Sequence, residues 1–393
     1  MKKKIAILGS TGSIGKNLLD VINKEKNNYQ IILLTANKNY STLLKQAKKF
    51  NVKNLIIKNK NSFKILKKKI KKNNKNNIQI YNNYSSFNKI FKKKIHYVMN
   101  SISGIDGLEP TLDIIKFTKK IAIANKESII CAWNLISKEL SKNNTQFIPV
   151  DSEHFSLWYA IKGIPKSSIE KIYLTASGGP LLKFAFKKPK NIKLSQALNH
   201  PTWSMGKKIS IDSCTMMNKV FEVIEAKHLF NLSYKQISIL THPNSYVHAI
   251  VKFKNGLIKI IAHDTTMKVP IYNTIMSDGS GLIKTDNLNL IKLNNLELKN
   301  VDYKLFPIVK TLKNLPEQIS LYETSIISIN DHLVNLFLNK KINYNQLQNL
   351  ILKFMRDKEL VRYKKIKPKN IQDILLVKNN VSSKINKYLS QND

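Results

Sequence analysis

Two carboxylates that lie two residues apart, Asp151 and Glu153, are candidate ligands for a divalent metal ion. They directly follow residues 146–150, an apolar run predicted to be a β-strand, and in an extended segment both side chains point to one side. Neighbouring carboxylates repel each other unless a cation or a proton lies between them. Their hard oxygen atoms suit Mg²⁺ or Mn²⁺ better than Zn²⁺. A solvated turn would carry the same residues, and this common pattern taken alone favours that alternative.

The segment 200–226 is predicted to be a loop followed by a helix. Its first part, residues 200–208, contains Pro, Gly, Ser and Trp, a composition typical of a mobile loop. From about Ser213 the apolar residues have helical spacing. We expect Ser213 near the helix start, where a hydroxyl and free backbone N–H groups suit an anion.

Three polar residues of this predicted helix share one face. Glu222 lies four residues after Asn218 and three after Lys219, so the three side chains are neighbours on the helix surface. A loop that closes over a carboxylate, an amide, an ammonium and a hydroxyl would form a lidded polar site. An amphipathic helix with a solvated charged face is the alternative, and the segment taken alone favours it.

Further polar groups directly follow predicted strands. Lys126 and Glu127 come after an apolar run at 120–124, and polar groups placed there face the ligand crevice of an open parallel sheet. Ser177 lies in the small-residue turn 176–180, which can present its hydroxyl and backbone N–H groups to an oxyanion. Both positions are therefore candidate ligand-binding positions.

A glycine-rich turn, Gly9-Ser-Thr-Gly-Ser-Ile-Gly15, joins a predicted strand at 4–8 to a predicted helix. This order of strand, turn and helix is typical of a dinucleotide-binding unit, with the pyrophosphate at the helix N-terminus. The G-x-x-G-x-x-G spacing is weaker evidence than G-x-G-x-x-G, and a tight turn without a ligand is the alternative.

The next predicted strand, residues 30–36, ends in Asn37-Lys38-Asn39. An NAD-binding unit usually has an acidic residue there to accept the ribose hydroxyls. The absence of an acid and the presence of Lys38 favour a 2′-phosphate and hence NADP.

The elements that must position these groups alternate between strands and helices, which predicts an α/β fold. Further strands are predicted at 54–58 and 96–100, with helices at 43–50, 60–77 and 108–118. A hairpin with Asn255-Gly256 at its turn is predicted to join strands at 249–253 and 257–262. From about Leu305 onward the pattern is almost wholly helical.

The composition limits the classes of partner. A formal net charge of +41 would ordinarily indicate nucleic acid, but Arg occurs only at Arg356 and Arg362, and Arg is the residue best suited to bidentate contacts with guanine and phosphate. The Lys residues are spread among Asn and Ile, so we expect no nucleic-acid partner.

No apolar run reaches the roughly 18 residues that span a bilayer. With Cys131 and Cys214 as its only cysteines, the chain is expected to be cytoplasmic and free of a disulfide framework.

Taken together and in order, the motifs resemble those of the 1-deoxy-D-xylulose 5-phosphate reductoisomerase family, which acts in non-mevalonate isoprenoid biosynthesis. The resemblance covers about the first 270 residues, and the C-terminal third agrees mainly in its helical character. The matching segments are Gly9–Gly15, Ala124–Ser128, Pro149–His154, Ser177–Pro180, and His200–Gly206 running on to Glu222.

The resemblance implies one divalent cation held by Asp151, Glu153 and Glu222. It also implies a substrate site in which some residues hold the phosphate and others contact the substrate near the metal. The phosphate residues would be Ser177, Ser213, Asn218 and Lys219, with His200 closing from the loop. The residues nearer the metal would be Lys126 and Ser152, with Trp203 covering the substrate.

The resemblance further implies NADPH as the cofactor, with Met205 and Met267 near the nicotinamide. The implied NADPH-binding residues are Thr11, Gly12, Ser13, Ile14, Asn37, Lys38, Asn39, Asn125, Glu127 and Gly206. The implied metal is Mg²⁺ or Mn²⁺, with Co²⁺ as an alternative. The implied reaction rearranges the carbon skeleton of the substrate and then reduces the resulting aldehyde to 2-C-methyl-D-erythritol 4-phosphate. Another NADP-linked, metal-assisted dehydrogenase would use similar groups, and product identification would separate the two.

The implied architecture is a homodimer of chains in three parts. A Rossmann-like NADPH domain would span 1–150, and a central catalytic and dimerisation domain would span 151–276. A linker at 277–304 would lead to a helical domain at 305–393.

Four residues depart from the family pattern. Asn37 and Ala176 stand where Gly is usual, Val220 stands where a small residue follows the Asn-Lys pair, and Thr266 replaces an acid. None of them is an implied metal or phosphate ligand, so we expect activity to be retained.

Overall fold

The computed structural model describes residues 2–72, 77–184, 192–276 and 282–391. The chain divides into two compact units. Unit 1 contains residues 1–128, 135–151 and 267–283, and unit 2 contains residues 129–134, 152–266 and 284–393. Each unit is described by itself.

Unit 1 is built on a parallel sheet that has seven strands in the described part of the chain, in the order β4-β3-β2-β1-β5-β6-β7. Its strands read as nearly continuous apolar runs, as expected for a sheet covered on both faces. The strands are β1 (Lys3–Leu8), β2 (Tyr29–Ala36), β3 (Asn54–Ile57), β4 (Gln79–Tyr81), β5 (Tyr97–Asn100), β6 (Lys120–Ile123) and β7 (Gln146–Pro149).

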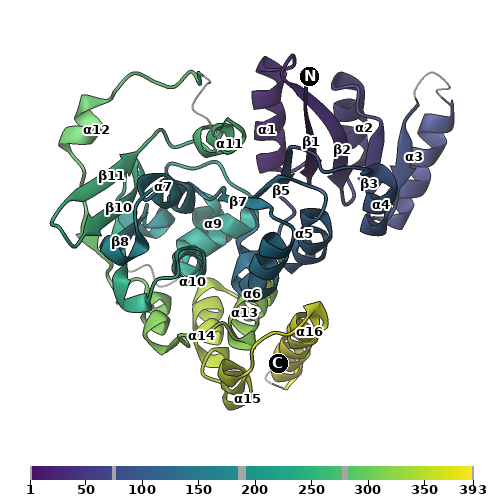
Figure 1. The fold of residues 1–393 in the computed structure, drawn as a ribbon. Coiled ribbons are helices and arrows are strands. Elements are labelled where there is room, and N and C mark those ends of the chain that lie inside the picture. The colour runs from purple at the N-terminus through teal and green to yellow at the C-terminus, as the bar shows by residue number, and fades with distance from the viewer. Residues whose placement is uncertain (1, 73–76, 185–191, 277–281, 392–393) are drawn as a thin grey trace. The chain divides into compact units, whose positions relative to one another are not determined.

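Helices connect these strands, and α11 adds a segment from much later in the chain (Figure 1). The apolar faces of α1, α2 and α11 pack into the buried core that contains Ile5, Leu34 and Leu55. The helices are α1 (Ser13–Lys24), α2 (Tyr40–Lys49), α3 (Lys60–Lys72), η1 (Tyr84–Ser86), α4 (Phe87–Ile90), η2 (Ile105–Gly107), α5 (Leu108–Ile115), α6 (Lys126–Lys142) and α11 (Lys268–Ile275).

Unit 2 contains a mixed sheet that has five strands among the described residues, in the order β11-β10-β8-β9-β12. Strands β8 and β9 are parallel, and the other neighbouring pairs are antiparallel. The strands are β8 (Ile169–Ala176), β9 (Ile237–Thr241), β10 (Val247–Phe253), β11 (Ile258–Ala262) and β12 (Lys299–Asn300). Helix α7 (Ser152–Ala160) packs on β10 and β11, and α10 (Met217–Phe230) packs on β8 and β9.

The rest of unit 2 is mainly helical, and its long helix α13 packs against both α16 and α9 (Figure 1). A capping box formed by Ser320 and Glu323 begins α13. The remaining helices are η3 (Lys166–Ser168), η4 (Gly179–Phe184), α8 (Leu194–Leu198), α9 (Lys207–Cys214), η5 (Tyr234–Gln236), α12 (Leu290–Asn294), η6 (Pro307–Asn314), α13 (Leu321–Leu338), α14 (Tyr344–Phe354), α15 (Lys358–Val361), η7 (Arg362–Lys365) and α16 (Ile371–Ser390).

The predicted α/β fold is confirmed, as are the hairpin at Asn255-Gly256 and the helical C-terminal part. Strands β4, β9 and β12 were not predicted, because each is short or lacks a clear alternation of apolar and polar residues. The predicted helix 60–77 ends at Lys72, and residues 73–76 lie outside the described residues. Residues 277–281 of the predicted linker also lie outside them. The three-part domain division stays a prediction.

Two local predictions are wrong. Asp151 and Glu153 do not lie in an extended segment, because helix α7 begins at Ser152, directly after Asp151. Ser213 does not lie near a helix start but one residue before the end of α9. Helix α9 begins at Lys207, before the predicted helix start. Met216 adopts a left-handed backbone (φ 62°), which cannot continue a right-handed helix, so the second helix, α10, begins only at Met217.

Within the described residues, no helix is both long enough and apolar enough to cross a membrane.

Candidate active site

The glycine-rich turn of unit 1 follows β1, beside the point where the strand order reverses between β1 and β5. Ligands of open α/β sheets bind at such a point, outside the carboxyl ends of the strands. Gly9 has φ 79°, and a Cβ there would lie 2.8 Å from the carbonyl oxygen of Ser101. A Cβ on Gly15 would lie 2.5 Å from Ser10 Cα. These two glycines therefore let the turn pack tightly, while Gly12 and Ser13 remain exposed at the start of α1.

The three residues after β2 lie at the same end of the sheet. Asn37, Lys38 and Asn39 are exposed, and Asn39 begins α2 by accepting a hydrogen bond from the Thr42 N–H at 3.0 Å. The N–H of Ser10 donates to the carbonyl oxygen of Thr35 at 2.9 Å, which joins this strand end to the glycine-rich turn. An exposed ammonium beside a dinucleotide-binding turn suits a 2′-phosphate.

The start of α6 holds the polar residues that follow β6. The Asn125 side chain accepts a hydrogen bond from the Ser128 N–H at 2.7 Å and donates to the carbonyl oxygen of Gly104 at 2.6 Å. Lys126 is largely buried, and its ammonium lies 2.6 Å from the carboxylate of Asp151. Glu127, the next residue, is half-buried.

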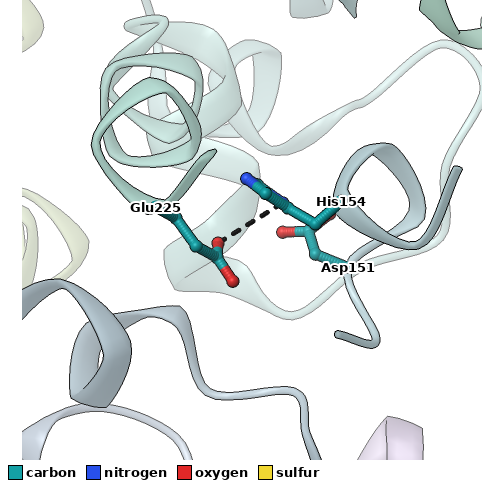
Figure 2. A group of neighbouring side chains, drawn as sticks. All are labelled: Asp151, His154 and Glu225. Atoms are coloured by element: carbon teal, nitrogen blue, oxygen red, sulfur yellow. Dashed lines mark ion pairs between the residues drawn. The ribbon is translucent and has the colours of Figure 1, made fainter. Parts of the chain in front are cut away.

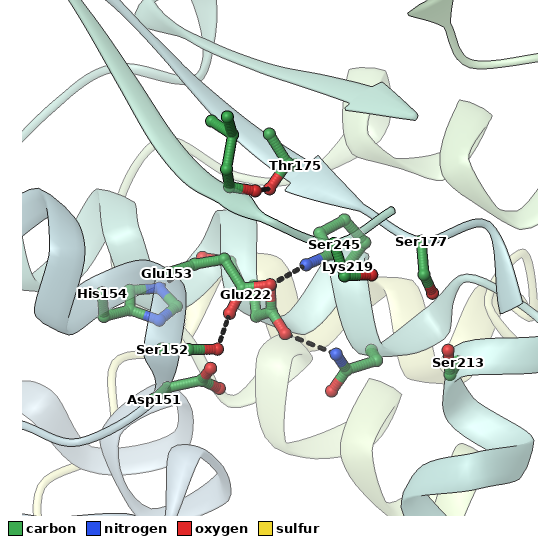
Figure 3. Close-up of polar contacts among 12 residues, drawn as sticks. Asp151, Ser152, Glu153, His154, Thr175, Ser177, Ser213, Lys219, Glu222 and Ser245 are labelled. Atoms are coloured by element: carbon green, nitrogen blue, oxygen red, sulfur yellow. Dashed lines mark hydrogen bonds and ion pairs between the residues drawn. The ribbon is translucent and has the colours of Figure 1, made fainter. Parts of the chain in front are cut away.

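Three carboxylates come together at the start of α7. Glu153 lies in the first turn of α7, Glu222 lies on α10, and Asp151 is joined by its peptide bond to the first residue of α7 (Figure 3). One oxygen of each of these three lies within 4.8 Å of the others. Oxygen donors at this spacing fit a single hard divalent cation such as Mg²⁺ or Mn²⁺.

Lys219 supplies positive charge to two of these carboxylates. Its ammonium lies 2.7 Å from Glu153 Oε1 and 2.5 Å from Glu222 Oε2. The two carboxylates outweigh the effect of burial and raise the pKa of Lys219, although burial alone would lower it. Asn218 donates a hydrogen bond to Glu222, and Ser152 Oγ donates to Glu153 Oε2 at 2.5 Å. The predicted common face of Asn218, Lys219 and Glu222 is thus confirmed, but Lys219 and Glu222 are buried and Asn218 is half-buried, so the face is not a solvated one.

A second polar group is made by two hydroxyls and an imidazole. His200 Nε2 lies 3.0 Å from Ser177 Oγ and 3.1 Å from Ser213 Oγ. His200 Nδ1 accepts a hydrogen bond from the Trp203 N–H at 2.9 Å, so Nε2 carries the proton of the neutral ring. Burial, and secondarily the charge of Lys219, lowers the pKa of His200 to about 4. At neutral pH the ring is therefore an uncharged donor between two hydroxyls.

The turn that presents Ser177 depends on glycine. Gly178 and Gly179 have φ values of 76° and 60°, which residues with a side chain rarely adopt. A Cβ on Gly179 would lie 2.9 Å from the carbonyl oxygen of Ser213. The N–H of Gly179 donates to Ser177 Oγ at 3.1 Å. The turn and α9 therefore approach so closely that Ser177 and Ser213 face the same imidazole.

The loop that contains His200 rests on the start of β10. Trp203 is half-buried, and its ring meets the His248 ring edge-on with the centroids 6.1 Å apart. His248 in turn stacks on His263 at 3.7 Å. Thr202 Oγ1 lies 3.2 Å from Ser245 Oγ. At the far end of the loop, Gly206 is exposed and caps α9.

Comparison with known proteins decides which family this arrangement belongs to. The family models for 1-deoxy-D-xylulose 5-phosphate reductoisomerase, for the C-terminal domain of that enzyme and for a further DXP reductoisomerase C-terminal domain match residues 5–133, 147–230 and 264–384. A 1-deoxy-D-xylulose 5-phosphate reductoisomerase of Pelagibacter ubique (strain HTCC1062) is 55% identical over 385 residues, which are 98% of each chain. The chain belongs to the 1-deoxy-D-xylulose 5-phosphate reductoisomerase family.

Other members of the reductoisomerase family agree along the whole chain. The enzyme of Clostridium novyi (strain NT) is 36% identical over 98% of this chain and 99% of its own. A crystal structure of DOX-P reductoisomerase in complex with NADPH, fosmidomycin and magnesium is 30% identical and superposes with a TM-score of 0.89, covering all of both chains. The reductoisomerase from Zymomonas mobilis in complex with NADPH is 29% identical, with a TM-score of 0.82 over 97% of each chain.

Two of the four departures from the reductoisomerase pattern, Asn37 and Ala176, cause no backbone strain. Asn37 and Ala176 do not have the positive φ that would require glycine, and Ala176 pairs regularly with Thr241 in the sheet. Val220 is fully buried on α10 and fills the core. Thr266 is half-buried, and nothing in the structure explains its replacement of an acid.

One buried pair beside the carboxylates was missed at the sequence level. His154 Nε2 lies 2.9 Å from the carbonyl oxygen of Glu222, and because a carbonyl only accepts, the imidazole donates. The other ring nitrogen faces the Glu225 carboxylate at 3.5 Å (Figure 2). The positions of His154, three residues after Asp151, and of Glu225, three after Glu222, are the sequence signals for this pair.

Proposed function

We propose that this chain converts 1-deoxy-D-xylulose 5-phosphate to 2-C-methyl-D-erythritol 4-phosphate, using NADPH and a divalent metal ion, in the non-mevalonate route to isoprenoids. The observation that carries this proposal is the convergence of Asp151, Glu153 and Glu222 next to Lys219, whose charge also acts on His200. The site thus offers ligands for a metal and groups for a phosphate close together. The family membership of the whole chain supports the same reaction.

The metal would be held by Asp151, Glu153 and Glu222, whose oxygen donors fit Mg²⁺ or Mn²⁺, with Co²⁺ as a further substitute. When bound, the cation supplies Lewis-acid polarisation of the substrate oxygens. Lys126 and Ser152 would orient the substrate beside it. Lys126 is suited to this because its ammonium is already placed against Asp151.

The substrate phosphate would be bound by Ser177, Ser213, Asn218 and Lys219, with His200 donating from the loop. The neutral His200 ring, the two hydroxyls and the Lys219 ammonium together offer hydrogen-bond donors and one positive charge to a dianion. The phosphate is remote from the reacting carbons, so its binding energy can close the loop and order the site. Trp203 would then cover the substrate and exclude water.

NADPH would bind at the glycine-rich turn, with its pyrophosphate at the start of α1. Lys38 would contact the 2′-phosphate from the end of β2. The other NADPH contacts that we propose are Thr11, Gly12, Ser13, Ile14, Asn37, Asn39, Asn125, Glu127 and Gly206.

The decisive experiment incubates the purified chain with 1-deoxy-D-xylulose 5-phosphate, NADPH and Mg²⁺ or Mn²⁺, and measures NADPH oxidation together with the carbon skeleton of the product. We expect metal-dependent oxidation and a branched product. A product with an unbranched skeleton would identify a simple dehydrogenase. No oxidation at any pH from 6 to 9 would refute the reaction.

Glu222→Gln tests the metal assignment. The change should abolish turnover and weaken Mn²⁺ binding, measured by electron paramagnetic resonance, while NADPH binding is retained. Glu170→Gln is the matched control, because Glu170 forms an exposed ion pair with Lys252 at the start of β8. Near-normal turnover in Glu222→Gln would contradict the assignment.

We also propose a cytoplasmic homodimer with the domain division 1–150, 151–276, 277–304 and 305–393. Cys131 and Cys214 are both buried and form no disulfide within the described residues, which fits a reducing compartment. Strand β11 lies at the edge of its sheet and exposes Ile258 and Ile260, an apolar edge of the kind that pairs with a second chain. Light scattering of the wild type should give the mass of a dimer, and Ile260→Lys should give a monomer. A monomeric wild type would refute the homodimer.

A further inference from the structure

Two residues that flank Ser213 on α9 are hydrogen-bonded to the C-terminal helices. The Asp212 carboxylate accepts a hydrogen bond from Asn330 Nδ2 on α13 at 2.7 Å. The carbonyl oxygen of Cys214 accepts a hydrogen bond from the Tyr344 hydroxyl on α14 at 3.2 Å. The helix that carries Ser213 is therefore held by residues of two helices more than a hundred positions later in the chain.

The charged side chain of Lys208 connects three helices. Its ammonium lies 2.9 Å from Asp212 Oδ2 and 2.9 Å from Asp331 Oδ1 on α13. The same ammonium lies 5.3 Å from the centre of the Phe221 ring on α10. One side chain thus contacts α9, α10 and α13, and the first two of these helices carry Ser213 and Lys219.

The burial of Asp212 makes the position of α9 depend on these contacts. Asp212 is 2% exposed and Asn330 is fully buried, so both oxygens of a buried carboxylate are committed to named partners. A buried charge is tolerated only when its partners are in place. Rotation of α9 that moved Ser213 would pull Asp212 away from Asn330 and Lys208 away from Asp331, and this cost opposes the rotation.

We propose that Lys208, Asp212, Asn330 and Asp331 are positioning residues for the substrate phosphate. They hold α9 against α13, so that Ser213 Oγ stays 3.1 Å from His200 Nε2 and both face the phosphate. The C-terminal helices, which carry none of the proposed ligands, therefore act on the site through α9. This inference rests on the proposed function.

The test compares Lys208→Met with Lys208→Arg. Lys208→Met removes the charge that joins Asp212 to Asp331, and a small misplacement of Ser213 should raise the Michaelis constant for 1-deoxy-D-xylulose 5-phosphate by about 10- to 100-fold. The turnover number at saturation and the dissociation constant of NADPH should stay close to those of the wild type. Lys208→Arg keeps the charge and should recover most of the affinity.

Lys384→Met is the matched control. Lys384 on α16 also bridges two carboxylates, Asp357 at 3.2 Å and Glu359 at 2.5 Å, and its exposure is similar to that of Lys208. Neither of its partners lies on α9, so Lys384→Met should lower the melting temperature without changing the Michaelis constant. Asp331→Asn, at a half-exposed residue, provides a milder variant if Lys208→Met does not fold.

A wild-type Michaelis constant in Lys208→Met and Asp331→Asn, or an equal rise in Lys384→Met, would overturn the positioning role. These outcomes differ from a failure of the proposed function, in which the wild type itself shows no turnover. In that case calorimetric binding of inorganic phosphate replaces the assay. Weaker phosphate binding in Lys208→Met than in the wild type and Lys384→Met then supports the positioning role, and equal binding overturns it.

Discussion

The ammonium of Lys219 lies 2.7 Å from the carboxylate of Glu153, although 66 positions separate the two residues in the chain. The same ammonium contacts Glu222, so one buried cation is shared by two of the three carboxylates that would hold the metal. The proposed metal and phosphate sites consequently share a residue. A change at Lys219 is expected to affect both.

Lys219→Met should therefore destabilise the protein and disable the site. Removing one partner of a buried ion pair typically costs about 3–5 kcal/mol, because the other charge is left buried without compensation. Mg²⁺ should restore part of the lost stability by binding the same carboxylates. Melting temperatures with and without Mg²⁺ test this, and a Mg²⁺ effect no larger than in the wild type would contradict it.

Gly179→Ala should destabilise the turn that contains Ser177 by more than the cost of placing a side chain on a left-handed backbone. A side chain at φ 60° costs about 1–2 kcal/mol, and the contact with the Ser213 carbonyl adds an overpacking cost of about 1–3 kcal/mol. Gly163→Ala is the matched control, since Gly163 has φ 75° but nothing within 4 Å of an added Cβ. Urea unfolding should show the larger loss in Gly179→Ala, and only this variant should bind substrate more weakly. Equal losses of unfolding free energy in the two variants would show that the Ser213 backbone moves away from the added methyl group, which would contradict this prediction.

The lowered pKa of His200 has a defined effect on stability. The folded-state pKa of about 4 lies below the unfolded value of 6.5, so between these values the unfolded chain binds more protons. The stability contributed by neutral His200 is complete above pH 6.5 and is lost as the pH falls toward 4. Other histidines shift in the same direction, so the measurement is the difference between the wild type and His200→Gln in urea unfolding from pH 7 to 4. The variant should lose stability less steeply, and parallel curves would contradict the assignment.

Lys38→Glu should change the preference for the cofactor. A carboxylate at this exposed position would repel the 2′-phosphate of NADPH and accept the ribose hydroxyls of NADH. We expect the Michaelis constant for NADPH to rise about tenfold or more, because roughly one charged hydrogen bond to the 2′-phosphate is lost. The Michaelis constant for NADH should stay equal or fall. Lys53→Glu, at an exposed lysine next to the amino end of β3, is the matched control and should leave both constants unchanged. Equal effects of the two substitutions would show that only overall charge matters.

The sequence was most informative where the relevant interactions are local. The strand, glycine-rich turn and helix at 4–22 were predicted correctly, because the glycines and the apolar periodicity lie within one short segment. The common face of Asn218, Lys219 and Glu222 followed from helical spacing in the same way. The break at Met216 was not predicted, because a methionine in a left-handed conformation is imposed by its surroundings and has no local signature.

By itself, the sequence determined which chemical groups the protein possesses and, through the order of its motifs, the family to which it belongs. Only the tertiary structure decided that Glu222 meets Glu153, that Lys219 lies between them, and that Asp212 is held by Asn330. Turns and helix faces are governed by the conformations of adjacent residues, which can be read from a short segment. Contacts between distant segments depend on how the whole core packs, and neither composition nor periodicity contains that information.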